Sequence, residues 1–221
     1  MKRFKLGFTL AEVLITLSII GVISALTLPS LTINHKKNVT TAQVKRVVNR
    51  ILNAQVMAEA NGKYLDLIDD DSLADVFLSQ LPVQTRCLNG EDSCGLTTFK
   101  TLHRGDTGLA LDSDVHRYML TDGTYMAFVD ESTENSQRFT IYFDINGSDG
   151  PDVMGHDVFA LLFAKDENTG NYRPFTAPAD YEGRFKKDGY GCKGNSEEGV
   201  TTNGKYCLWR IMTDGYKINY W

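Results

Sequence analysis

Residues 8–28 read FTLAEVLITLSIIGVISALTL, and Glu12 is the only charged residue among them. A helix of this length spans about 31 Å at about 1.5 Å per residue, which is enough to cross the hydrocarbon core of a membrane once. Three basic residues precede it at positions 2, 3 and 5. Because a positive flank stays in the cytoplasm, the sequence predicts one membrane span with everything after Leu28 exported.

The apolar stretch does not have the form of a cleavable secretory signal, which would be shorter and would end in a small-residue cleavage site. Here apolar residues continue past Ser24 and Ala25 to Leu28. Glu12 is also unusual for a simple anchor. A carboxylate in an apolar helix costs on the order of 2.5 to 3.5 kcal/mol at the bilayer centre and less near an end. Glu12 therefore requires a partner or an interfacial position.

Residues 5–14, KLGFTLAEVL, resemble the leader of type IV pilins and type II secretion pseudopilins. In that family a short basic leader ends in Gly, a Phe follows, and a Glu lies four residues beyond the Phe. The resemblance implies that a prepilin peptidase cuts between Gly7 and Phe8 and methylates the new Phe8 amine. It also implies that the helix stays with the mature protein, and that Glu12 neutralises the N-terminal amine of a neighbouring subunit in a filament. Pro29 falls where many members carry a helix-kinking proline.

Beyond Pro29 the apolar spacing becomes that of an amphipathic helix ending near Asn61 and Gly62. Lys45, Arg46 and Arg50 fall on its polar face, as a solvated surface or a contact between subunits. The predicted buried face contains Val44, Val47, Val48, Ile51, Leu52 and Val56. The expected organisation is a leader at 1–7, a transmembrane and filament-core helix at 8–28, its amphipathic continuation at 29–62, and a globular head at 63–221.

The remaining sequence predicts an α+β head in which an antiparallel sheet packs on the long helix, as in pilins. A short helix is expected at 72–81, and two strands within 118–129 are joined by a turn at Asp122 and Gly123. A third strand is expected at 139–143. The stretch 165–200 is predicted to be mostly loop, 206–212 to be the last strand, and Asp214-Gly215 to be the last turn.

Four cysteines lie in the exported part, where an oxidising environment favours two disulfides over free thiols. Three connectivities are possible. The spacing favours Cys87 with Cys94 and Cys192 with Cys207. Neither pair has the close spacing that is typical of a zinc site.

Residues 144–157, DINGSDGPDVMGHD, place oxygen-bearing side chains at alternate positions between glycines, a pattern that suits Ca²⁺. Asp149 stands where a calcium-binding EF-hand loop has its Gly, and no Glu closes the loop. The competing interpretation is that these residues form turns capped by carboxylates. The stretch 144–159 also resembles a segment of some bacterial prepilin-like proteins, and major pseudopilins bind calcium in their heads. The candidate ligands are Asp144, Asn146, Ser148, Asp152 and Asp157.

The sequence offers little support for an enzyme, because the four histidines are scattered and no nucleophile elbow, phosphate loop or zinc-protease motif is present. Asp112, Asp114 and His116 could form a cluster, but a solvated strand edge accounts for them better. The acidic balance, 28 Asp and Glu against 23 Lys and Arg, also argues against nucleic-acid binding.

These observations predict a non-enzymatic structural subunit, a pilin or pseudopilin of a type IV pilus or a type II secretion pseudopilus. Its expected partners are other such subunits, prepilin peptidase and the inner-membrane assembly platform. Its expected location is the inner membrane, with a single span and a periplasmic head, and then the filament. The alternative is a membrane-anchored periplasmic module that binds calcium or another ligand and does not polymerise.

Overall fold

The computed structural model describes residues 7–62, 76–87, 94–102, 109–111, 115–133, 137–174, 192 and 204–220. The chain divides into two compact units, Met1–Val39 and Thr40–Trp221. Helix α1 (Leu10–Ala60) begins in the first unit and ends in the second. The two units differ in what surrounds their apolar side chains, so each is taken by itself.

In the first unit, α1 is continuous through Pro29 and exposes its apolar side chains. Phe8 is 90% exposed and Leu10 is 81% exposed. By length and composition this is a helix that can cross a membrane. The helix that occupies the predicted span at 8–28 therefore exposes its apolar surface, and no described residue of the same unit packs against it.

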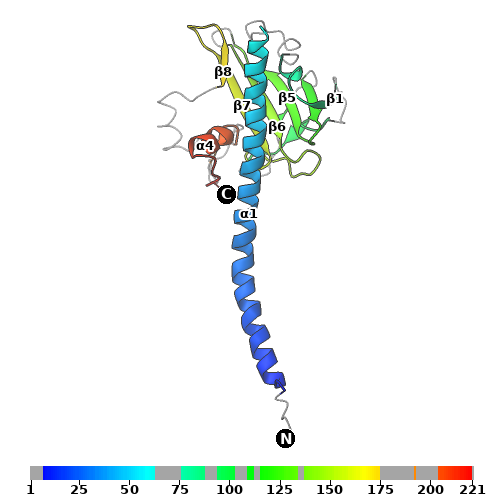
Figure 1. Cartoon of the computed structure of the whole chain (residues 1–221), viewed down its shortest axis with the longest axis vertical. Helices are drawn as coiled ribbons and strands as arrows, with labels where there is room; N and C mark the ends of the chain where they lie inside the picture. The colour runs from blue at the N-terminus through cyan, green and yellow to red at the C-terminus, as the bar shows by residue number, and fades with distance from the viewer. Residues whose placement is uncertain are drawn as a thin grey trace. The chain divides into compact units, whose positions relative to one another are not determined.

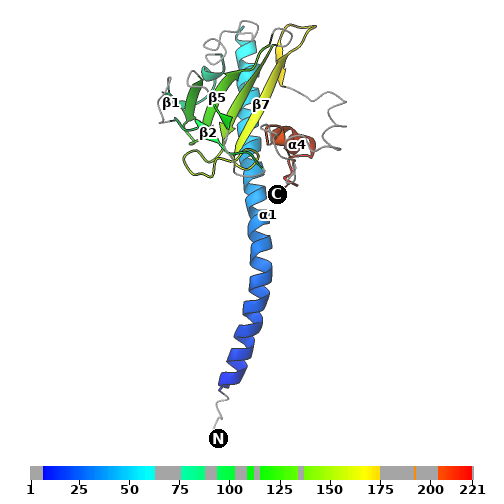
Figure 2. The ribbon, with the colours of Figure 1, turned by 180° about the vertical axis from the view of Figure 1, so that it is seen from behind.

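The second unit is an α+β fold in which residues 40–60 of α1 lie across one face of a six-stranded antiparallel sheet, as predicted (Figure 1). The strand order is β1-β4-β5-β6-β7-β8. Seen from behind, the opposite face carries a short two-stranded ribbon that includes β2 (Figure 2). The strands are β1 (Val83–Cys87), β2 (Thr98–Phe99), β3 (Leu109–Ala110), β4 (His116–Leu120), β5 (Tyr125–Asp130), β6 (Arg138–Asp144), β7 (Val158–Lys165) and β8 (Tyr172–Pro174).

Side chains alternate between the two faces of the sheet along each strand, and a separate cluster of residues covers each face. Tyr118, Ile141 and Phe143 face α1 and join its buried residues in the main core. Ala127 and Tyr142 face the other way and pack with Phe99 of β2. This second cover explains why β6 is almost wholly buried and not half polar.

The predicted hairpin is confirmed, since β4 and β5 pair antiparallel and Gly123 takes a positive φ of 82° in the turn. The strand predicted at 139–143 is β6. Residues 76–78 of the expected helix at 72–81 are helical, and its earlier residues lie outside the described ranges.

The predicted buried face of α1 is wrong at one position. Val44, Val47, Val48 and Ile51 are fully buried, but Val56 is 62% exposed. Positions 51, 54, 55 and 58 continue one face at a spacing of 3.6 residues per turn, whereas position 56 has rotated away from it. Ala54, Gln55 and Ala58 are therefore the buried residues of the last turns.

The strand predicted at 206–212 is also wrong, because this segment forms helix α4 (Cys207–Thr213). Residues such as Tyr206, Trp209 and Ile211 favour a strand. Instead Leu208 and Ile211 are buried together in the main core, at helical spacing. Tertiary packing has outweighed local preference. The turn predicted at 214–215 is present, with a positive φ at Gly215.

Candidate functional sites

Gly7 and Phe8 lie just before α1, and Glu12 lies in its first turn. The backbone amide and Oγ1 of Thr9 each donate to Glu12 Oε2 at 2.8 Å, and the Glu12 amide bonds Thr9 Oγ1 at 3.3 Å. This is a capping box, in which the two side chains satisfy the free amides of a helix start. Glu12 therefore has a local partner within the chain, which the sequence analysis did not identify.

The apolar residues around this start are available for contact with other helices or lipid. The apolar side chains along one side of the helix, which would face the core of a helix bundle, are all exposed. They are Leu10, Val13, Leu14, Leu17 and Ile20. A surface of this kind must be covered by a non-aqueous partner when the protein functions.

The acidic loop 144–157 joins two neighbouring strands, with Asp144 at the end of β6 and Asp157 just before β7. Both carboxylates are buried, with Asp144 2% exposed and Asp157 6% exposed. Burial of this kind is expensive for a charged group unless a partner compensates it. Each buried carboxylate therefore needs partners, which the loop itself or a bound cation must supply.

Asp157 braces the loop through its backbone. Its Oδ1 accepts hydrogen bonds from the amides of Val153 at 2.5 Å and Val158 at 3.1 Å, and its Oδ2 accepts from Asp152 at 3.1 Å. This is the capping role that the turn interpretation predicts. Burial raises the pKa of Asp157, with a smaller contribution from Asp152, against these hydrogen bonds.

Asp144 and Asn146 are less completely satisfied. Asp144 accepts from the Asn146 amide at 3.1 Å. Burial raises the pKa of Asp144 to about 7, and the charges of Asp157 and Asp152 add to this effect. The Oδ1 atom of Asn146 is buried and accepts no hydrogen bond within the described part of the chain. A buried oxygen without a donor, beside a carboxylate, fits the chemistry of a hard cation ligand.

The other two candidate ligands are placed differently. Ser148 is exposed, and Asp152 is half-buried with a positive φ of 54°. Across the described ranges, no three His, Cys, Asp or Glu side chains are gathered as a metal site. Amide, backbone or water oxygens would therefore have to complete any calcium shell. Asp144, Asn146 and Asp152 fit such a shell better than Ser148.

Both cysteine pairs favoured by spacing are joined, Cys87 to Cys94 and Cys192 to Cys207. All four cysteines are fully buried. The first bridge fastens β1 to the segment that follows it. The second fastens residue 192 to the start of α4.

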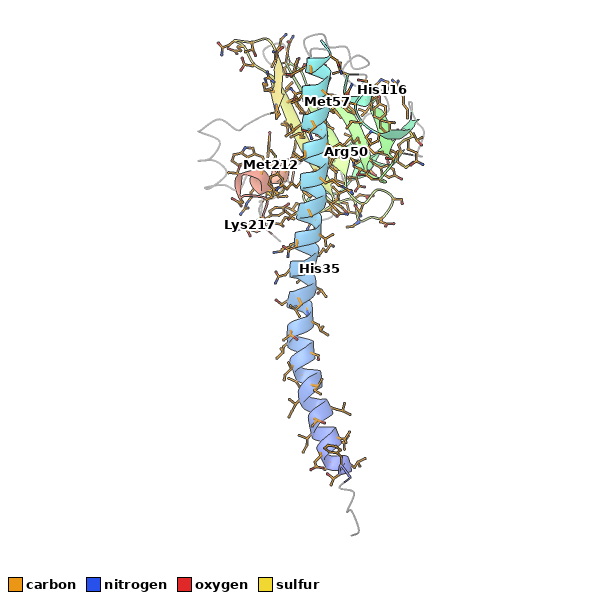
Figure 3. The ribbon with its side chains drawn as sticks, in the orientation of Figure 1. His35, Arg50, Met57, His116, Met212 and Lys217 are labelled. Carbon is orange, nitrogen blue, oxygen red and sulfur yellow. A yellow bond between two sulfur atoms is a disulfide. The ribbon has the colours of Figure 1, made fainter. Side chains whose placement is uncertain are left out.

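The basic face of α1 is used within the head. Arg50 Nη1 lies 2.6 Å from Asp122 Oδ2, and Arg46 lies 3.3 Å from the same oxygen. Arg50 lies on the part of α1 that crosses the sheet (Figure 3). No local pattern could have indicated a pairing between residues so far apart in sequence. Of the suggested Asp112, Asp114 and His116 cluster, only His116 falls within the described residues.

A second ion pair between residues far apart in the sequence lies on the face of the sheet opposite α1. Lys205 Nζ approaches Glu131 at 2.5 Å, and the hydroxyl of Tyr142 donates to the same carboxylate at 3.1 Å. This contact fastens the residues before α4 to the end of β5. No local sequence pattern indicates this contact either, since its residues are far apart in the chain.

Comparison with known proteins gives one match, which is confined to the N-terminus. Residues 2–28 match the family model described as the prokaryotic N-terminal methylation motif. This match supports the resemblance predicted from residues 5–14. Searches of the curated proteins and of the solved structures find no match to the chain.

Proposed function

We propose that this chain, which carries the N-terminal methylation motif of the type IV pilin and pseudopilin class, is a structural subunit of a filament of that class. The observation that carries the proposal is the joint occurrence of the motif and an exposed apolar helix that starts directly after the Gly7–Phe8 junction. The first supplies the processing signal. The second supplies a surface that lipid covers before assembly and neighbouring helices cover afterwards.

Three steps follow from this proposal. Prepilin peptidase cleaves after Gly7 and methylates Phe8, the inner-membrane platform extracts the processed subunit, and α1 packs against α1 of neighbouring subunits. Glu12 then leaves its contact with Thr9 and pairs with the Phe8 amine of a neighbour. The head lies in the periplasm until the subunit enters the filament.

Processing is tested by mass spectrometry of the mature N-terminus. We expect an N-methylated Phe8 in the native host, and we expect Gly7→Ala to leave the precursor uncut. A mature N-terminus at any residue other than Phe8 would overturn the leader assignment.

Assembly is tested separately with Glu12→Ala, which should insert into the membrane normally and lose incorporation into filaments. Ser18→Ala is the matched control, because Ser18 is also a polar residue of the apolar helix and bonds only its own backbone, at Leu14 O. Equal incorporation of the two variants would remove the proposed role of Glu12. Disulfide or chemical crosslinking between subunits distinguishes a filament from the alternative, a periplasmic module that does not polymerise.

We also propose that the loop 144–157 binds Ca²⁺, with Asp144, Asn146 and Asp152 as the principal ligands. The buried Oδ1 of Asn146, which has no hydrogen-bond donor among the described residues, favours this over a purely structural turn. Calcium at millimolar concentration should raise the Tm of the full chain in detergent, and Asp144→Ala should abolish the rise. Glu167→Ala, which removes an exposed carboxylate from another turn, is the control. A Tm that does not respond to calcium would return the loop to a structural turn.

A further inference from the structure

The loop 144–157 packs directly on the segment that carries the second disulfide. Gly155 takes a positive φ of 83°, and a Cβ at this position would lie 2.8 Å from Cys207 Sγ. The backbone of the loop therefore touches the sulfur with no side chain between them. A side chain at position 155 would therefore displace either the loop or the disulfide.

Two further contacts join the same two segments. The hydroxyl of Tyr220 donates to Gly155 O at 2.6 Å. A Cβ at Gly204 would meet Met154 at 2.8 Å, so Gly204 also allows close approach. Residues on both sides of α4 thus contact the same two loop residues, Met154 and Gly155.

One candidate ligand, Asp152, connects to this contact through Asp157. Its carboxylate holds the amides of Asp152 and Val153, which directly precede Met154 and Gly155. On the other side, Lys100 and the loop exchange backbone hydrogen bonds at Asp152 O, 2.7 Å, and Met154 N, 2.8 Å. The loop is therefore held between the β2 ribbon and the C-terminal segment. The Asp157 carboxylate fixes the backbone between the candidate ligand Asp152 and the residues that face the disulfide.

We infer that the Cys192–Cys207 disulfide sets the calcium affinity of the loop 144–157, and that calcium in turn protects this disulfide from reduction. The inference rests on the proposed calcium site. Its physical basis is that a cross-link restrains Gly155 and Met154, so the loop loses less conformational freedom when it binds the ion. By linkage, any such coupling acts in both directions with the same magnitude.

The chain contains a matched control in its other disulfide. Cys87 lies on β1, the edge strand, and β4 and β5 separate β1 from the β6 strand that carries Asp144. Removal of that bridge costs the head a cross-link that does not include Cys207, whose sulfur lies against Gly155. A general loss of rigidity can thus be told from a specific one.

The first experiment measures calcium affinity of the full chain in detergent by isothermal titration calorimetry. We expect the double variant Cys192→Ser, Cys207→Ser to bind about tenfold more weakly than the unmodified chain, within the usual range of coupling between sites. The variant Cys87→Ser, Cys94→Ser should change affinity much less. Equal affinities in both variants would overturn the coupling and leave the calcium site standing, whereas no binding to the unmodified chain would overturn both.

The second experiment needs no variant and therefore does not depend on whether the serine variants fold. Dithiothreitol reduces each disulfide to two thiols and is itself oxidised to its cyclic disulfide. Alkylation and peptide mass spectrometry then follow the two bridges in one sample. Calcium should slow reduction of Cys192–Cys207 and leave Cys87–Cys94 nearly unchanged, and equal slowing or no slowing would contradict the inference.

Discussion

Asp122 links the β4–β5 turn to α1 through a single carboxylate. It accepts hydrogen bonds from Arg50 and from the amide of Thr124, two residues further on, and it forms an ion pair with Arg46. Partial burial alone would raise the pKa of Asp122, but the hydrogen bonds from Arg50 and Thr124 and the charge of Arg50 outweigh it and lower the pKa. The folded head therefore favours the ionised form.

This lowered pKa makes the contribution of Asp122 depend on pH in a definite direction. The stabilisation is fully present above the unfolded value of 3.8 and is lost as the pH falls through the lower folded value. Asp122→Asn should reduce the free energy of unfolding at pH 7 by about 1 kcal/mol, because solvent screens this partly exposed pair. The difference from the unmodified chain should shrink in acid, as followed by denaturant unfolding. Glu167→Gln is the control, and a difference independent of pH would contradict the assignment.

Gly155 and Gly170 illustrate two different reasons why a position requires glycine, namely its backbone conformation and the space around it. Both have positive φ values, 83° and 72°, but only Gly155 meets another residue where a Cβ would stand. Gly170→Ala should cost about 1 kcal/mol, the usual conformational penalty. Gly155→Ala should cost at least about 2 kcal/mol, because Cys207 or the loop must also move. Thermal unfolding of the two variants measures this difference, and equal costs would mean that the loop moves freely away from the disulfide.

At the scale of elements, the buried stripe of α1 holds the helix to the sheet. Ile51 is fully buried in the main core, whereas Val56 is largely exposed. Ile51→Ala should destabilise the head by about 2 to 5 kcal/mol, and Val56→Ala should change stability by less than about 0.5 kcal/mol. Both substitutions replace a β-branched residue of one helix with alanine, so helix propensity changes alike. Similar losses measured by denaturant unfolding would place Val56 in an interface.

The elements that local sequence predicts well are those whose signals are periodic and close together. The helix predicted over 8–28, the stripe from Val44 to Ile51 and the Asp122-Gly123 hairpin all belong to this kind. The structure contains the stripe and the hairpin, and it contains the helix from Leu10 onward. The sequence predicts a strand where α4 forms, because a segment of seven residues that includes Trp209 and Ile211 carries a weak helical signal on its own. Its burial against the sheet, a long-range contact, decides its structure.

The candidate sites divide in the same way. Residues Gly7, Phe8 and Glu12 form a motif within a few residues, and the sequence alone indicates their role. The contacts of Gly155 with Cys207 and of Arg50 with Asp122 join distant parts of the chain, and no local pattern encodes them. The ligand chemistry of residues 144–157 was visible in the sequence, but the unpartnered Asn146 oxygen was not.

At the scale of the whole molecule, the two compact units differ in whether their apolar side chains are buried. Within Thr40–Trp221, the sheet is covered on both faces and both disulfides are formed. Within Met1–Val39, the apolar side chains of the helix are exposed. The first arrangement is complete in water, whereas the second requires lipid or other helices.

This difference predicts how the chain responds to truncation at the boundary between the units. A fragment that begins at Thr40 keeps the buried stripe of α1, since Thr40 is its first buried residue. We expect this fragment to be soluble without detergent, to melt cooperatively and to retain both disulfides, because no core residue has been removed. The full chain should require detergent or a bilayer under the same conditions. Light scattering and calorimetry compare the two, and an aggregated or unfolded fragment would show that residues before Thr40 stabilise the head directly.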